Sequence, residues 1–195
     1  STMGRGFWIL DNINSIHEKN LALNNNYLFQ IQDTFRYRYR GARRNAIPNY
    51  PVSSVIIDYH LNNDLSEEIT LNITNDKKEI IYTATTSKID TSKKVTDMGT
   101  GFTREVSSSS LSKKIGTNRF RWNMRHLGAW DKDPKKAFLN GPLVAPGKYM
   151  AHLNINNKSY SSEFEVLMDP NILKSGIRST NVQAQEKLAL QVRSL

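Results

Sequence analysis

The sequence predicts a mostly β protein built as an antiparallel sandwich, with an extended N-terminal segment and a short C-terminal helix. Two observations predict the strands: apolar and polar residues alternate with a period of two in several stretches, and tight-turn residues join neighbouring stretches. The third observation is that no helical periodicity separates these stretches, which favours hairpin links over parallel crossovers.

The first predicted strand is "VSSVIIDYHL", because its apolar side chains alternate with polar ones. After it, "ITLNIT", the turn residues "NDKK" and the returning "EIIYTAT" predict a hairpin over residues 68–85. Residues 86–116 are rich in Ser, Thr and Lys, so we expect a long loop or weak edge strands there.

The later strands follow the same alternation. "NRFRWNMR" predicts one strand, and "KYMAHLNI" with "YSSEFEVL" predicts a hairpin across Asn156 and Asn157. The segment "GPLVAPG" before that hairpin precedes a strand rather than a helix, which excludes a phosphate-binding loop. We expect Pro146 and Gly147 to form the centre of a type II turn. Alternation across separate strands predicts a core of Val55, Ile57, Tyr59, Leu71, Phe120, Trp122, Leu153 and Phe164.

Helical signals lie only near the two ends. Residues 11–20 predict a helical turn, and Thr180 with Gln183 fits a capping box that would begin a C-terminal helix. The predicted apolar face of that helix consists of Val182, Gln185, Ala189 and Val192, with Leu188 and Leu195 beside it.

An arginine-rich stretch, "FRYRYRGARR", contributes to the net charge of +9. Arginines interleaved with aromatics can bind single-stranded nucleic acid, but no nucleic-acid module surrounds this stretch, so we expect no nucleic-acid partner. We expect the arginines to dock the segment against its neighbours, while Tyr37 and Tyr39 bury their rings on the opposite face. The candidate interaction surface is Arg36, Arg38, Arg40, Arg43, Arg44 and, from a separate loop, Trp130.

Residues that could carry catalysis are not grouped in the sequence. The absence of cysteine excludes disulfides and a cysteine nucleophile, and the four histidines lack the spacing of a metal site. Paired carboxylates of the glycosidase type meet only in space, so the sequence leaves them open but nominates none. We therefore predict a protein that is not an enzyme, with no catalytic, cofactor-binding or metal-binding residue.

Two tryptophans raise carbohydrate binding as an alternative, because exposed indole rings on a β-sandwich can stack on sugars. Trp122 alternates with Phe120 and Met124, so we favour a core position for it. Trp130 lies in a predicted loop and could serve either as a structural staple or as a platform for a sugar.

Several blocks resemble one known family in order along the chain. "GRGFWILDNI" resembles the closing strand of a β-propeller in secreted bacterial BNR-repeat, sortilin-like proteins, which are often labelled glycosyl hydrolases. "LFQIQDTFRYR" is similar to the linker that follows that propeller. "GTNRFRWNMRHLGA" and residues 141–171 resemble the sandwich C-terminal to it, and "NVQAQEKLALQVRSL" resembles the helical region that comes next.

The resemblance implies a propeller-derived strand and linker over residues 1–50, an Ig-like or fibronectin-III-like β-sandwich over 51–170 and a helical stub over 171–195. It also implies a secreted, periplasmic or cell-surface location, with the adjacent β-propeller of the parent chain as a partner and polysaccharide or another protein as further partners. The expected function is that of a non-catalytic scaffold or interaction module. The alternatives are a carbohydrate-binding module of a glycosyl hydrolase and, third, an excised enzyme domain.

Neither a membrane span nor a signal peptide is visible. No run approaches the roughly eighteen apolar residues that cross a bilayer, and the segment around "FWIL" lacks the three-part pattern of a secretory signal. Because the chain opens at Ser1 without an initiator methionine, we expect it to be a processed or excised piece.

Overall fold

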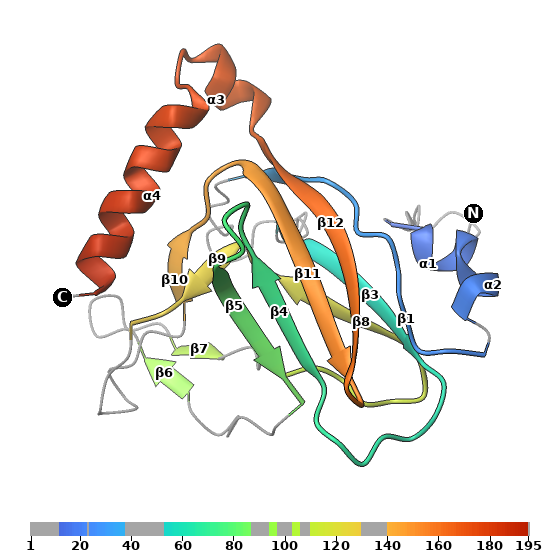
Figure 1. Ribbon diagram of the computed structural model, residues 1–195. Coiled ribbons are helices and arrows are strands. Elements are labelled where there is room, and N and C mark those ends of the chain that lie inside the picture. The colour runs from blue at the N-terminus through green and yellow to red at the C-terminus, as the bar shows by residue number, and fades with distance from the viewer. Residues whose placement is uncertain are drawn as a thin grey trace, which may run out of the picture.

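Two β-sheets share one hydrophobic core in the computed structural model, which describes residues 12–22, 24–37, 53–86, 94–96, 103–105, 110–129 and 140–194. The smaller sheet is antiparallel, in the order β1 (Tyr27–Leu28), β3 (Val55–Leu61) and β8 (Gly116–Trp122). The larger has the order β2 (Thr34–Arg36), β12 (Lys158–Met168), β11 (Gly147–Ile155), β4 (Thr70–Thr74) and β5 (Ile80–Thr85). In it, β2 runs parallel to β12. The neighbours among β12, β11, β4 and β5 are antiparallel (Figure 1).

The remaining elements are short strand pairs and helices. Strand β9 (Arg125–Leu127) pairs with β10 (Asn140–Leu143), and β6 (Lys94–Thr96) pairs with β7 (Thr103–Glu105). The helices are α1 (Asn14–His17), α2 (Lys19–Ala22), α3 (Pro170–Lys174) and α4 (Ser179–Arg193). The prediction of a mostly β chain ending in a helix is therefore confirmed. None of these helices combines the length and the apolar character needed to cross a bilayer.

The core lies between the inner faces of the two sheets and is centred on Trp122. Its ring centroid lies 5.9 Å from that of Tyr149, 6.1 Å from Phe164 and 6.2 Å from Tyr82, so β8 touches three strands of the larger sheet. All eight predicted core residues are buried, each at most 7% exposed. The alternation that predicted them is confirmed, since a period of two places alternate side chains on one face of a strand.

Both predicted hairpins are present. Strands β4 and β5 pair within residues 68–85, and β11 pairs with β12 along its whole length. Asn156 and Asn157 join the second pair with φ values of +45° and +63°. A type I′ turn requires positive φ values at both of its central positions, and asparagine adopts such values more easily than most residues.

The segment before β11 differs from its prediction. Gly147 has a φ of +158°, far from the +80° or so that a type II turn needs at its third residue. Gly141 belongs to strand β10, where a Cβ atom would collide with the backbone oxygens of His126 and Leu127. The glycine is needed because the main chain of β10 lies so close to that of β9 that no side chain fits between them.

The predicted start and face of the C-terminal helix are partly wrong. Helix α4 begins at Ser179, and the Asn181 side chain accepts a 2.9 Å hydrogen bond from the backbone N–H of Arg178, so Thr180 and Gln183 do not form the cap. Val182 is buried, but Leu188 and Val192 are each 63% exposed. Gln185 and Ala189 of the predicted face line a cleft beside β10, whereas the bonds to β9 come from Glu186 and Arg193, which lie outside the predicted face.

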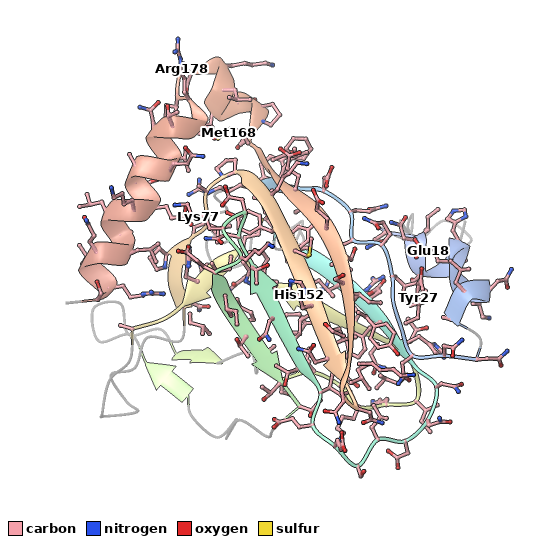
Figure 2. The ribbon with its side chains drawn as sticks, viewed as in Figure 1. Glu18, Tyr27, Lys77, His152, Met168 and Arg178 are labelled. Carbon is pink, nitrogen blue, oxygen red and sulfur yellow. The ribbon has the colours of Figure 1, made fainter. Side chains whose placement is uncertain are left out.

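The predicted N-terminal helical turn is confirmed by α1 and α2, which lie beside β1 and β3 in Figure 1. Phe29, just after β1, is buried, as is Ala22 of α2. The weak strands expected within residues 86–116 are represented by β6 and β7, which pair with each other. Figure 2 shows Tyr27 and Glu18 facing each other in this region, where the Tyr27 hydroxyl donates a 3.3 Å hydrogen bond to Glu18.

Candidate interaction site

Helix α4 lies against β10, and two polar contacts join it to β9. Val182 of this helix is buried, and Nε2 of His126 lies 2.6 Å from Oε1 of Glu186. The two side chains are only 8% and 17% exposed, so little water reaches this contact. At the last residue of the helix, Nη1 of Arg193 donates a 3.0 Å hydrogen bond to the carbonyl oxygen of Leu127. These contacts fix the helix at both of its ends.

Two further arginines bind main-chain oxygens in the same region. Nε of Arg36, at the end of β2, donates a 2.7 Å hydrogen bond to the carbonyl oxygen of Val144. Nη1 of Arg125 donates a 3.0 Å bond to the carbonyl oxygen of Gly141. We use the name helix seam for five residues: Arg36, Arg125, Arg193, His126 and Glu186. The guanidinium group suits this role because it presents several donors in a fixed plane.

A shallow cleft of about 210 Å³ lies within the helix seam. Its walls are Arg36, Arg125, Pro142, Leu143, Gln185, Glu186 and Ala189. Burial raises the pKa of the Tyr149 hydroxyl, and the negative charge of Glu186, a residue of the cleft wall, raises this pKa further. The phenol therefore stays neutral and donates a 2.7 Å hydrogen bond to the carbonyl oxygen of Ala145.

Of the six residues predicted as an interaction surface, Arg36 takes part in the helix seam. Arg38, Arg40, Arg43, Arg44 and Trp130 lie outside the described residues. The predicted burial of the tyrosine rings is wrong for Tyr37, which is 45% exposed and packs on the partly exposed ring of Phe35. Tyr39 lies outside the described residues. Strand β2 lies at the edge of the sheet, and its Arg36 side chain points toward the residues before β11. The aromatic side chains on the opposite face of the strand are therefore left at the surface.

Trp122 is not available as a sugar platform. The side chain is 1% exposed, and its Nε1 donates a 3.0 Å hydrogen bond to the carbonyl oxygen of Arg125. The core position predicted for it is confirmed. This indole also links the core to the helix seam, since Arg125 contributes to both.

Sequence reasoning missed two pairs of polar side chains in the described residues, His126 with Glu186 and Asp58 with Arg119. His126 and Glu186 are sixty residues apart, and neither position carried a motif that would pair them. Asp58 is 3% exposed and pairs with Arg119 at 2.7 Å, although the alternation in "VSSVIIDYHL" predicts that Asp58 lies on the face opposite Val55, Ile57 and Tyr59. A signal for the second pair did exist, because Asp58 and Arg119 are direct cross-strand partners once β3 and β8 are aligned by their apolar residues.

No group of three or more histidine, aspartate or glutamate side chains converges within the part of the chain that the structure describes. Comparison of the chain with family models, with curated proteins and with solved structures finds no match.

Proposed function

We propose that the chain is a non-catalytic β-sandwich of the Ig-like or fibronectin-III-like type that acts as a scaffold or interaction module. The strand order supports this fold type. Strands β1, β3 and β8 correspond to A, B and E of that architecture, and β12, β11, β4 and β5 correspond to G, F, C and C′. The parallel edge strand β2 then lies beside G.

A second feature supports the same fold type. Tyr149 lies near the start of the strand equivalent to F, and its hydroxyl donates to the carbonyl oxygen four residues upstream. Immunoglobulin-type domains have a tyrosine at this corner that makes the same kind of bond. The likeness supports the fold alone, because one fold hosts many functions.

The helix seam is the observation that carries the proposed role. Three arginines from three different elements each donate to a main-chain carbonyl, and a buried histidine–glutamate pair holds the terminal helix against them. Side chains that hydrogen-bond to a neighbouring segment stabilise the position of that segment relative to their own. We propose that the module positions neighbouring domains of a longer chain relative to one another. As the sequence resemblance implies, we propose an adjacent β-propeller as its partner and a secreted or surface location.

The proposed absence of catalysis is tested with a panel of aryl glycosides. We expect no turnover by the purified chain beyond that of buffer. Turnover that disappears when a single aspartate or glutamate is changed to its amide would contradict the proposal, because it would identify a working carboxylate.

Nucleic-acid binding is tested separately by salt titration with labelled single-stranded DNA. The scaffold role predicts only weak binding that survives Arg36→Ala, since Arg36 is committed to Val144. Micromolar affinity near physiological salt that is lost in this variant, with a steep salt dependence, would contradict it.

A further inference from the structure

A second hollow lies beside the turn between β11 and β12. Figure 1 shows this turn at the end of the sheets that lies away from α3. We call it the asparagine pocket, because six of its lining residues are Asn24, Asn25, Asn26, Asn62, Asn63 and Asn156. They come from three segments: the stretch before β1, the loop between β3 and β4, and the turn between β11 and β12. Three distant segments thus place the same uncharged side chain around one hollow of about 190 Å³.

The pocket is held open by bonds between its own walls. Oδ1 of Asn26 accepts a 2.9 Å hydrogen bond from the backbone N–H of Asn62, and Nδ2 of Asn62 donates a 3.3 Å bond to the carbonyl oxygen of Asn24. Asn156 is fixed on the third side by its left-handed turn conformation. A ligand would therefore meet a preformed site and would not have to order these loops.

Other groups in the pocket remain available. Within the described residues, the exposed side-chain amides of Asn25, Asn63 and Asn156 make no hydrogen bond. Each amide offers two N–H donors and one carbonyl acceptor. Tyr160 packs one side of its ring against the core and is only half-buried, so part of the ring lines the pocket.

We propose that the asparagine pocket binds a single ring of a neutral saccharide. A sugar hydroxyl both donates and accepts hydrogen bonds, and an amide side chain matches that combination. No carboxylate lines the pocket, which disfavours a metal cation, and Lys158 is the one charged lining residue. The volume lies below the range of about 300–1,000 Å³ that is usual for larger ligands, so it suits one ring.

The position of the pocket agrees with the proposed fold. The loops between β3 and β4 and between β11 and β12 are equivalent to the B–C and F–G loops, which form the ligand-binding end of immunoglobulin variable domains. Asparagine and tyrosine are also among the residues enriched in such loops. This inference rests on the proposed non-catalytic module and names the class of ligand that the module would recognise.

The test is an NMR titration of the full chain with the methyl glycosides of glucose, galactose, mannose and N-acetylglucosamine. Side-chain amide signals report on asparagines directly. We expect at least one glycoside to shift the signals of Asn25, Asn63 and Asn156. Either Asn25→Ala or Asn63→Ala should weaken binding about three- to tenfold, the usual effect of one hydrogen bond. Asn171→Ala, an exposed change on α3, is the matched control and should leave the affinity unchanged.

Two outcomes would overturn the inference: no shift with any of the glycosides, or shifts that both pocket variants retain. The backbone signals in the same spectra show whether each variant is folded. Release of methanol during the titration would have a different meaning. It would contradict the non-catalytic function proposed above, while the amide shifts would still decide whether the asparagine pocket is where the sugar binds.

Discussion

The hydroxyl of Tyr149 donates a 2.7 Å hydrogen bond to the carbonyl oxygen of Ala145, at the corner where the chain enters β11. Both residues are buried, at 7% and 3% exposed, so water cannot replace this bond. Tyr149→Phe keeps the ring and leaves the carbonyl without its partner. We expect the free energy of unfolding to fall by about 1–3 kcal/mol in urea denaturation, the cost of an unsatisfied buried group. Tyr37→Phe, at an exposed ring, should cost less than about 0.5 kcal/mol. Equal effects of the two changes would contradict a structural role for this corner.

Truncation of the central indole tests the position of the core. Trp122 touches rings from three strands of the opposite sheet and is almost fully buried. Trp122→Ala should therefore lower the free energy of unfolding by roughly 3–5 kcal/mol. Ile115→Ala is the control, since Ile115 is 64% exposed. A loss below about 1 kcal/mol for Trp122→Ala would mean that the indole is at the surface.

The Asp58–Arg119 pair predicts an asymmetry between its two members. Asp58 is 3% exposed and Arg119 is 33% exposed. Arg119→Ala strands a buried carboxylate, which should cost about 3 kcal/mol. In Asp58→Ala the remaining guanidinium can turn toward water, so we expect a smaller loss. Arg121→Ala, at an exposed position on the same strand, is the control and should change stability by less than about 0.5 kcal/mol. Thermal or urea denaturation of the three variants decides the order, and a larger loss for Asp58→Ala would contradict it.

Stability should fall at alkaline pH through a buried phenol. Burial raises the pKa of Tyr59 to about 12, and its hydroxyl donates a 2.7 Å hydrogen bond to the carbonyl oxygen of Ser112. A tyrosine in the unfolded chain ionises near pH 10. The stabilisation is therefore complete below about pH 10 and is lost as the pH rises through about 12, a change of about 2–3 kcal/mol.

Urea denaturation over this pH range, with tyrosinate absorbance followed in parallel, measures the effect. Tyr59→Phe removes the ionisation, so its stability should depend less on pH than that of the unchanged chain. An identical pH dependence in both proteins would show that Tyr59 does not ionise with unfolding.

The strands and the core were predictable because every second side chain of a strand lies on the same face of its sheet. Trp122 and Leu153, for example, sit in alternating stretches and are buried as expected. The helix seam was not predictable, because the distance between Glu186 and His126 along the chain leaves no local pattern. The burial of Asp58 was missed for a related reason. Periodicity assigns a face of a strand but does not show that the backbone around Asn12 and Phe29 approaches that face.

The asparagine pocket illustrates the same limit of local patterns. Its asparagines were visible in the sequence as turn formers, and Asn156 with Asn157 was correctly predicted as a turn. Their convergence depends on the order of strands in both sheets. A sequence pattern fixes which residues turn, whereas the sheet topology fixes which turns become neighbours.

Helix α4 lies against β10, and the helix seam holds it there and on β9. The chain has no cysteine, so Leu188→Cys provides a unique site for a paramagnetic label on the exposed side of the helix. The label should broaden the NMR amide signals of Leu127 and Asn140, whereas a label at Ile115→Cys, beside the start of β8, should spare them. Glu186→Ala should weaken the broadening, because it removes the partner of His126. Unbroadened Leu127 and Asn140 signals in a folded, labelled Leu188→Cys chain would show that the helix is not docked and would contradict the account.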